Sequence, residues 1–225
     1  MTAISVSNDK IEVSTKRLEK VLLGGTFDPI HNGHLTSAQD LIKVMGYDSI
    51  SLMPCGQAYH KEGSSQSQHR LNMVKLAVEP FPGLLVDDRE VKRQGATYTV
   101  DTLQKIRQEL GSNAHIVWVM GTDSAKSLEQ WHQWQHIFTL ANVIVISRAA
   151  EPELNLPHWP AKQVNNVNKF KQHASGCYMQ LGLTPVDLSS SEVREAINNH
   201  KPVDNHVPQA VIEYIEQHGL YRGLN

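Results

Sequence analysis

The hydrophobic positions in the first part of the chain switch between a short run and a helical spacing. Residues 21–23 form an apolar run short enough for one strand, and two glycines close it. In residues 33–45 the apolar side chains recur at helical spacing, and Gly46 is placed to end that helix. Residues 49–53 are predicted to form the next strand. A strand, a helix and a strand in this order imply a right-handed crossover and a parallel sheet, whose ligands bind beyond the carboxyl ends of the strands.

The same alternation continues through the rest of the chain. A nearly unbroken apolar run over residues 114–120 is typical of a central strand that is buried on both faces. Residues 149–176 are rich in Pro, Asn, Lys and His and are predicted to form a loop with a short helix around residues 165–173. Such an insert could cover a site or contact another subunit. The other predicted elements are strands over residues 84–86 and 142–147, and helices over residues 68–78, from Tyr98 or Thr99 to Gly111, from Ser189 onwards, and through residues 207–215.

These elements predict an α/β fold that is Rossmann-like and doubly wound, with a mainly parallel sheet, helices on both faces and helices at the C-terminal end. The chain has 225 residues, of which 40% are apolar, so one domain over residues 19–225 can bury a full core. Residues 1–18 have no clear period and are predicted to be a loose extension.

The charge and the cysteine content limit the classes of partner and the cellular compartment that are expected. A formal net charge of −2 gives no general attraction to nucleic acid or to an acidic membrane, so neither is expected as a partner. No run approaches the roughly 20 apolar residues of a membrane span, and the first twenty residues have no apolar core for a signal peptide. Cys55 and Cys177 form no C-x-x-C pair, which suits a reducing cytosol. A cytoplasmic protein is therefore expected, and a homo-oligomer remains possible.

The segment that follows the first strand, GGTFDPIHNGHL over residues 24–35, has the order of a strand-loop-helix phosphate site. Glycine lets the backbone turn sharply and approach a ligand. His31 and His34 are three residues apart, so both rings can reach the first turn of a helix that starts near Asn32. That end of a helix offers unpaired N–H groups and a partial positive charge. The segment therefore predicts a site for a polyphosphate.

Other interpretations of this segment fit less well. It has neither the G-x-G-x-x-G of dinucleotide oxidoreductases nor the G-x-x-x-x-G-K-[ST] of P-loop enzymes. His31 and His34 could be zinc ligands, but no third and fourth ligand stands at metal spacing.

The motifs TFDP (residues 26–29) and HNGH (residues 31–34) resemble the signature of the nucleotidyltransferase superfamily whose histidine-x-glycine-histidine box binds ATP and passes on its AMP. Further segments resemble one branch of that superfamily, the bacterial nicotinate-nucleotide adenylyltransferases. These segments are HK at residues 60–61, YTVDTL at 98–103, GTDS at 121–124, SSSEVR at 189–194 and GLYR at 219–222. Where that family usually has prolines before the histidine-lysine pair, this chain has Ala58 and Tyr59.

The resemblance implies an enzyme that moves AMP from ATP to nicotinate mononucleotide, giving deamido-NAD (nicotinate adenine dinucleotide) and pyrophosphate in NAD biosynthesis. It implies Mg²⁺ as cofactor, carried by the phosphates of ATP rather than by protein ligands. The implied catalytic residues are His31, His34, Lys61 and Arg194. The implied ATP-binding residues are Gly24, Gly25, Thr26, Phe27, His34, Gly121, Asp123, Ser189, Ser190 and Arg194. The implied residues for the mononucleotide are Asp28, His60, Tyr98, Thr99 and Trp131, whose indole would stack on the pyridine ring.

Several of these positions also have a structural interpretation. Lys61 could be a solvated charge on a loop, Asp123 could hold its own turn by capping Lys126, and Trp131 could pack in the core. Asp87 and Asp88 could hold magnesium or be ordinary turn residues.

Arg70, near the start of the helix predicted over residues 68–78, is interpreted as a surface charge. Capping explains the serines at 189 and 190 but not the placement of Arg194.

The implied chemistry needs no general base. The second pKa of a phosphate monoester is near 6, so the acceptor is already mostly a dianion at neutral pH and competent to attack. No nucleophile elbow or activated cysteine is present, which agrees with direct in-line transfer. The alternatives are a sister enzyme that uses nicotinamide mononucleotide or another phosphorylated acceptor such as phosphopantetheine, and a non-catalytic nucleotide sensor. Tyr98, Thr99 and Trp131 argue against phosphopantetheine, and the choice between acid and amide stays open.

Overall fold

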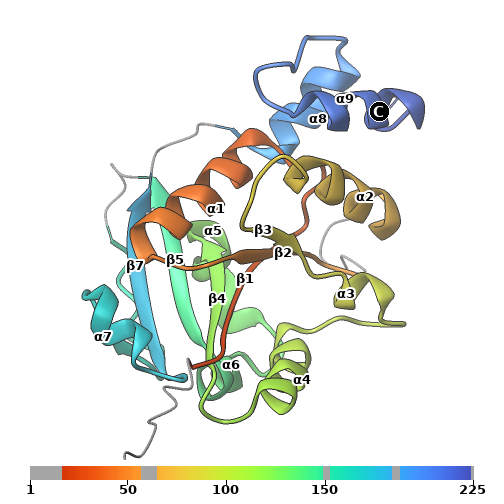
Figure 1. Cartoon of the computed structure of the whole chain (residues 1–225). Helices are drawn as coiled ribbons and strands as arrows, with labels where there is room; N and C mark the ends of the chain where they lie inside the picture. Colours follow the sequence, from red (N-terminus) through yellow and green to blue (C-terminus); the bar gives the residue numbers. More distant parts are fainter. Residues whose placement is uncertain (1–16, 57–64, 149–152, 184–187, 224–225) are drawn as a thin grey trace, which may run out of the picture.

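The structure is a computed structural model that describes residues 17–56, 65–148, 153–183 and 188–223. A seven-stranded sheet runs through it in the order β3-β2-β1-β4-β5-β7-β6, and every pair of neighbouring strands is parallel (Figure 1). The predicted Rossmann-like α/β fold is therefore confirmed. The strands are β1 (Glu19–Gly25), β2 (Ile50–Pro54), β3 (Leu84–Val86), β4 (His115–Gly121), β5 (Asn142–Arg148), β6 (Lys162–Gln163) and β7 (Cys177–Leu183).

The helices cover both faces of the sheet and continue beyond its carboxyl edge. Helix α1 ends where Gly46 adopts the left-handed conformation, and α4 begins after Tyr98 and ends before Gly111, as the sequence predicts. The described helices are α1 (Asn32–Met45), α2 (Ser67–Val78), α3 (Arg89–Lys92), α4 (Thr99–Leu110), α5 (Thr122–Ser127), the 3₁₀ turn η1 (Leu128–Gln130), α6 (Trp134–Leu140), α7 (Val167–Lys171), α8 (Ser190–Asn198) and α9 (Gln209–Gln217). Helices α8 and α9 lie past the ends of the strands, where α9 packs against α2 (Figure 1).

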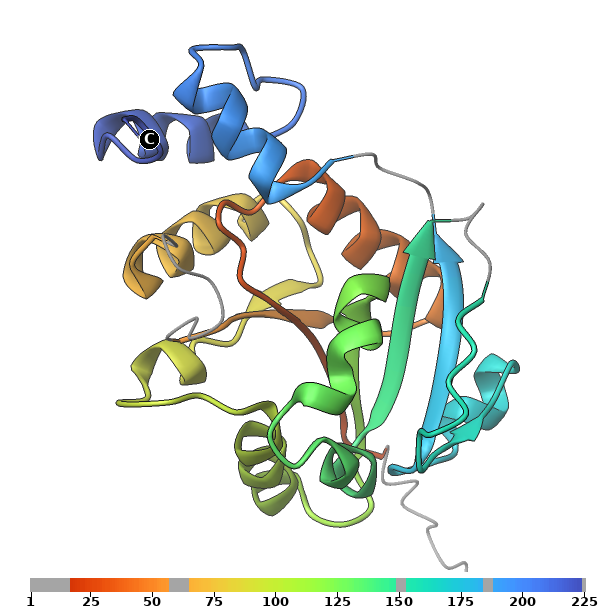
Figure 2. The same ribbon diagram turned by 180° about the vertical axis from the view of Figure 1, so that it is seen from behind.

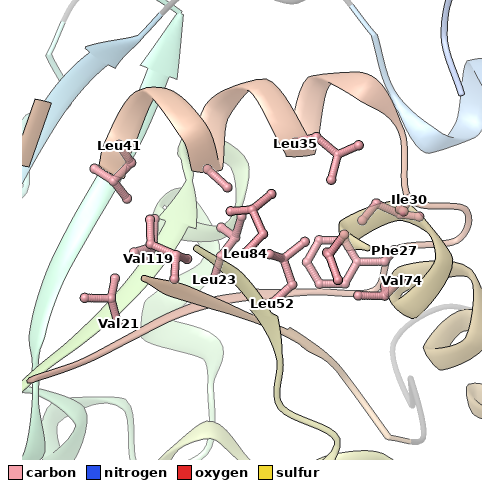
Figure 3. Packing of buried hydrophobic residues seen from close by; sticks show 14 of the residues in the cluster. Val21, Leu23, Phe27, Ile30, Leu35, Leu41, Leu52, Val74, Leu84 and Val119 are labelled. Atoms are coloured by element: carbon pink, nitrogen blue, oxygen red, sulfur yellow. The ribbon is translucent and has the colours of Figure 1, made fainter. Parts of the chain in front are cut away.

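Alternate residues of the central strands feed two separate hydrophobic clusters. Val21, Leu23 and Val119 lie in the cluster beneath α1 and α2, with Leu35 and Leu41 of α1 above them (Figure 3). The side chains between them, such as Leu22 and Trp118, point to the opposite face, which α4, α5 and α6 cover (Figure 2). A sheet buried on both faces explains why its strands read as unbroken apolar runs in the sequence.

Two strands near one edge of the sheet were not predicted. The segment assigned to a loop contains the predicted short helix, α7, but it also contains β6, and β7 follows it. Strand β7 carries Gln180 in its interior, which weakens the apolar pattern of a strand. The Gln180 amide is satisfied by Leu154, whose N–H donates to Oε1 at 2.8 Å and whose carbonyl accepts from Nε2 at 2.9 Å. Pairing of this kind between distant residues leaves no mark on local periodicity.

The described chain starts with residues that are fixed to the sheet. The N–H of His115 donates to the Leu18 carbonyl at 2.8 Å, and Arg17 donates to the carbonyls of Asn113 and Gln172. Residues 17 and 18 therefore belong to the folded body rather than to a loose extension, and residues 1–16 lie outside the described part.

The acidic pair after β3 is held by ion pairs. Asp87 contacts Lys20 at 3.2 Å and Arg89 at 2.8 Å, and Asp88 contacts Lys92 at 2.9 Å. These contacts account for both carboxylates as structural residues and leave the magnesium interpretation without support.

Candidate active site

The predicted ATP-binding loops come together where the order of the strands reverses. Strands β1 and β4 are neighbours, and Leu23 is paired with Val119. Two residues further along, Gly25 ends β1 and Gly121 ends β4. Chain connections leave the sheet in opposite directions at this point, and ligands of doubly wound folds bind in such a place. The two loops are therefore side by side at the carboxyl edge.

The glycines at the end of β1 are required by packing. A Cβ on Gly24 would lie 2.2 Å from the Trp118 ring, and a Cβ on Gly25 would lie 2.8 Å from the Phe27 ring. Any larger residue at these two positions would displace an aromatic side chain. Their role in ATP binding, and that of Thr26 and Phe27, stays a prediction.

The two histidines of the motif meet at the start of α1, as predicted. His31 is the N-cap residue, and α1 begins at Asn32. The rings of His31 and His34 stack with centroids 3.7 Å apart and planes inclined by 28°. The His31 N–H donates to His34 Nδ1 at 3.3 Å, and Phe27 packs its edge against the His34 ring. The pair is thus fixed in place before any ligand arrives.

Burial sets the charge of His31. Its side chain is 5% exposed, and loss of solvation lowers the pKa of its imidazole from 6.5 to about 4, against a smaller opposing effect of Glu192. His31 is therefore neutral at neutral pH. Its Nδ1 atom is buried and makes no hydrogen bond of full geometry among the described residues, although the His34 N–H faces the His31 side chain in a capping-box arrangement. A buried polar atom without a partner is uncommon in a folded protein, and such an atom beside a helix N-terminus suits a ligand oxygen.

Helix α8 brings Arg194 to the same turn. Its Nη1 donates to the Asp28 carbonyl at 2.7 Å and its Nη2 to Ser191 Oγ at 3.2 Å. Ser190 Oγ donates to the Pro29 carbonyl at 2.9 Å. The predicted capping box is present, because Ser189 Oγ accepts from the Glu192 N–H and the Ser189 N–H donates to the Glu192 carboxylate. The start of α8 is therefore fastened to residues 28 and 29, beside the histidine pair.

Asp28, predicted to bind the mononucleotide, is buried and already satisfied. Its Oδ1 accepts from the Tyr221 hydroxyl at 2.6 Å and from Ser65 Oγ, and its Oδ2 accepts from the Ser65 N–H at 3.2 Å. Burial and the Asp28 charge raise the pKa of Tyr221, so its hydroxyl stays protonated and donates. These contacts favour a role for Asp28 in holding the turn, and direct substrate contact stays a prediction.

The residues predicted to bind the pyridine ring are connected through a residue that the sequence did not single out. Tyr98 is the N-cap residue of α4, and Thr99 is its first residue. The Tyr98 ring lies 4.4 Å from the ring of exposed His132, centroid to centroid. His132 directly follows Trp131, which is half-buried against the cluster under α4, α5 and α6. The start of α4 and the tryptophan segment are thus close together, and the local sequence WHQW over residues 131–134 gave no signal of that contact.

The loop after β4 is less constrained. Gly121 has an ordinary φ of −80°, and a Cβ there would meet nothing within 4 Å. Asp123 is exposed in the first turn of α5, and within the described ranges no hydrogen bond involves its carboxylate. The alternative role of Asp123, capping Lys126, is not observed. His60 and Lys61 lie outside the described residues, so their predicted roles stay predictions.

Arg70 is the largest departure from the sequence analysis. Its side chain is 1% exposed, not a surface charge, and it donates to the backbone carbonyls of Thr26, Gly56 and Ser65. A signal was present, because Arg70, Val74 and Ala77 share one face of α2 at helical spacing. Position on an apolar stripe indicates burial even for a charged residue.

Two further features concern the part of the chain that the structure describes. No group of three or more His, Cys, Asp or Glu side chains is placed there to hold a metal ion. None of the helices described is both long and apolar enough to cross a membrane.

A parallel sheet with a histidine pair, an arginine and a helix N-terminus at its switch point is the arrangement expected of a nucleotidyltransferase. The model of the cytidylyltransferase-like family matches residues 22–196. A protein of Chromobacterium violaceum named "probable nicotinate-nucleotide adenylyltransferase" is 40% identical over 208 residues, which cover 89% of this chain and 97% of that protein. A protein of Hahella chejuensis with the same name is 39% identical over 219 residues, covering 91% and 96%. The chain therefore belongs to the nicotinate-nucleotide adenylyltransferase family within the cytidylyltransferase-like proteins.

A solved structure agrees with the fold. The Plasmodium falciparum nicotinic acid mononucleotide adenylyltransferase, complexed with NaAD, has a TM-score of 0.69 to this chain at 19% identity. The match covers 91% of this chain and 98% of the other. The architecture is thus shared far beyond the range of close sequence similarity.

Proposed function

We propose that this chain transfers AMP from ATP to nicotinate mononucleotide, which gives nicotinate adenine dinucleotide and pyrophosphate for NAD biosynthesis. The observation that carries the proposal is the stacked His31–His34 pair at the start of α1, with Arg194 fastened to the same turn. Relatives that share this chain over most of its length are named for the same activity.

The proposed mechanism uses position and charge rather than a covalent intermediate. The phosphate of nicotinate mononucleotide, already mostly a dianion, attacks the α-phosphorus of ATP, and the bond to pyrophosphate breaks. His31 and His34 donate hydrogen bonds to phosphate oxygens as negative charge shifts onto the leaving group. Arg194 and Lys61 bind the pyrophosphate, and the N–H groups at the start of α1 contribute their partial positive charge.

The remaining predicted residues have binding roles in this proposal. The segment from Gly24 to Phe27 and the loop with Gly121 and Asp123 contact ATP, and Ser189 and Ser190 place α8 against that site. The pyridine ring of the mononucleotide binds to Tyr98, Thr99 and Trp131. The free N–H groups at the start of α4 bind the carboxylate of that ring. His60 is also proposed to bind the mononucleotide, and Asp28 supports this part of the site by holding the turn in which it lies.

Magnesium enters this proposal with its substrate. Within the described ranges no three acidic, histidine or cysteine side chains come together to bind it, so the protein part seen here does not fit an all-protein metal site. Oxygen atoms of the triphosphate are ligands that Mg²⁺ prefers, and the ion would neutralise part of their charge.

We also propose that residues 19–225, together with the folded residues 17 and 18, act as one nucleotidyltransferase domain and that the protein works in the cytoplasm. The cysteines Cys55 and Cys177 are free thiols, which fits a reducing compartment.

A coupled assay of pyrophosphate release tests the function. Purified protein is given ATP and Mg²⁺ with either nicotinate mononucleotide or nicotinamide mononucleotide at equal concentration. We expect release with the acid at a clearly higher kcat/KM than with the amide. Preference for the amide would redirect the proposal to the sister enzyme, and no release with either acceptor would contradict it.

A further inference from the structure

A buried arginine lies beneath the turn that follows β1. Arg70 Nη1 donates to the Thr26 carbonyl at 2.8 Å and also contacts Cys55 Sγ at 3.4 Å. Its Nη2 donates to the Gly56 carbonyl at 2.5 Å, and its Nε donates to the Ser65 carbonyl at 3.2 Å. One guanidinium group therefore binds three backbone carbonyls from three segments of the chain.

These segments all border the proposed site. Thr26 belongs to the turn that precedes the histidine pair, and Cys55 follows β2, where its N–H donates to the Gly25 carbonyl at 3.0 Å. Ser65 in turn holds the Asp28 carboxylate through its N–H and its hydroxyl. Because Arg194 donates to the Asp28 carbonyl, a continuous set of hydrogen bonds runs from Arg70 to Arg194. A shift of Arg70 would therefore move the turn that leads into His31 and His34.

The arginine is a costly way to hold a turn. No described carboxylate lies within ion-pair distance of Arg70, so among the described residues its buried charge is stabilised by backbone carbonyls and by the contact with Cys55 Sγ. Burial of an unpaired charge disfavours the folded state, and an apolar side chain of similar length avoids that cost. A positive charge beneath a turn that binds a polyanion is useful, because the attraction persists where water is excluded.

We propose that Arg70 is a positioning residue for AMP transfer, holding the Thr26–Phe27 turn and the end of β2 in the geometry that places ATP against the histidine pair. The inference rests on the proposed function. Arg70 does not touch the reacting atoms. It acts through the carbonyls of Thr26 and Gly56, and its charge adds to the attraction for the triphosphate.

The chain offers a second carbonyl-binding arginine as a control at the amino ends of the strands, although Arg107 is half-buried whereas Arg70 is fully buried. Arg107 also binds several backbone carbonyls, but all of them precede strands, and none borders the proposed site. Its partners are the carbonyls of Leu140, Gly111, Ser112, Ala114 and Ala174, at 2.5–3.1 Å. A purely structural role for Arg70 predicts that substitution of either arginine lowers the unfolding midpoint while the folded variants keep kcat close to that of the wild type.

The experiment compares Arg70→Lys and Arg70→Met with Arg107→Lys and Arg107→Met. For each protein we measure kcat and KM for ATP and for nicotinate mononucleotide, the thermal unfolding midpoint, and the rise in that midpoint on adding ATP with Mg²⁺. We expect Arg70→Lys to lose about tenfold and Arg70→Met about a hundredfold in kcat/KM, mainly through kcat, because a small misplacement of reacting groups is costly. We expect the Arg107 variants to unfold at lower temperature and to keep kcat within about twofold of the wild type, since distant sites act independently.

The outcomes separate this inference from the proposed function. If the wild type releases no pyrophosphate, the function fails, and the ATP-induced rise in midpoint still tests Arg70 as part of a nucleotide site. If the wild type is active and the Arg70 variants match the Arg107 variants in both kcat and midpoint, only the inference fails. It also fails if neither Arg70→Lys nor Arg70→Met folds, because Arg70 would then be a structural residue. Partial recovery by lysine, which keeps the charge, supports it.

Discussion

The two edges of the sheet are built from the same kinds of groups but are completed differently. At the amino edge, Asn142 Oδ1 accepts from the Cys177 N–H at 3.0 Å and its Nδ2 donates to the His173 carbonyl at 2.9 Å. His115 is buried beside it and has partners for both ring nitrogens. At the carboxyl edge, by contrast, the buried Nδ1 of His31 has no partner among the described residues. The buried histidine of the amino edge is thus fully paired, whereas the buried histidine of the carboxyl edge has one ring nitrogen without a full hydrogen bond.

This difference separates stability from function. Buried polar groups that are fully paired hold the fold together and leave nothing for a ligand. A preorganised group without a partner costs stability, and a ligand that supplies the partner recovers that cost when it binds. The contrast between His115 and His31 is therefore consistent with a ligand site at the carboxyl edge, although Arg93 Nη1 and Trp118 Nε1 are also buried without a partner among the described residues. The following predictions test it, from the largest expected effect to the smallest.

The first prediction concerns the histidine pair itself. His34→Ala removes a ring that stacks on His31 at the carboxyl edge, and His34 is only half-buried, so the fold is retained. Loss of one preorganised donor to developing charge costs about 2.7–4 kcal/mol, so kcat for pyrophosphate release is expected to fall by about a hundredfold or more. Circular dichroism and the unfolding midpoint serve as the control for folding. Near-normal turnover in a folded His34→Ala enzyme would contradict the role.

The second prediction is that substitution by alanine has different effects on stability at two glycines of the site. Gly24→Ala places a Cβ 2.2 Å from the Trp118 ring, so it is expected to destabilise the fold by about 3 kcal/mol, the upper part of the range for overpacking. Gly121→Ala has free space and an ordinary φ, so stability stays within about 0.5 kcal/mol of the wild type.

Steady-state kinetics then test whether Gly121 belongs to the nucleotide site. If the Gly121 backbone approaches ATP, the added methyl group raises KM for ATP in the stable Gly121→Ala protein. Urea unfolding and steady-state kinetics measure both variants. An unchanged KM would remove Gly121 from the nucleotide site.

The third prediction is a pH dependence shared by the two edges. Burial lowers the pKa of His31 and of His115 from 6.5 to about 4, so the unfolded chain binds a proton first as the pH falls. Stability that is present above about pH 6.5 is therefore lost between about pH 6.5 and about pH 4, at about 2 kcal/mol per histidine from about pH 7 to about pH 5.

The pKa values of His31 and His115 are expected to respond differently when ATP is added. Bound triphosphate raises the pKa of His31 by its charge, and it leaves the pKa of His115 unchanged at the far edge. Histidine proton resonances followed against pH, with and without ATP, report both values. Equal responses of the two rings to ATP would contradict the contrast.

Local patterns in the sequence were sufficient for the parts of the molecule that are determined locally. The helical spacing and Gly46 predicted α1, the capping box predicted the start of α8, and the apolar run predicted β4. The histidines were placed correctly because a spacing of three residues and a helix start determine their relative position.

Features that depend on partners distant in sequence could not be predicted in the same way. The Gln180–Leu154 pairing in β7, the bond from Tyr221 to Asp28 and the contact of Tyr98 with His132 each join residues far apart in the chain. Arg70 is an intermediate case, because its position on the apolar face of α2 indicated burial although its three carbonyl partners could not be read from the sequence.

The central claim is that the carboxyl edge of the sheet binds the triphosphate of ATP. A crystal structure with a non-hydrolysable ATP analogue and Mg²⁺ tests it most directly. The account predicts phosphate oxygens within hydrogen-bond distance of the His31 and His34 rings and of Arg194, with the His31 Nδ1 atom paired or freed from burial. A triphosphate bound elsewhere, with the stacked histidines untouched, would contradict it.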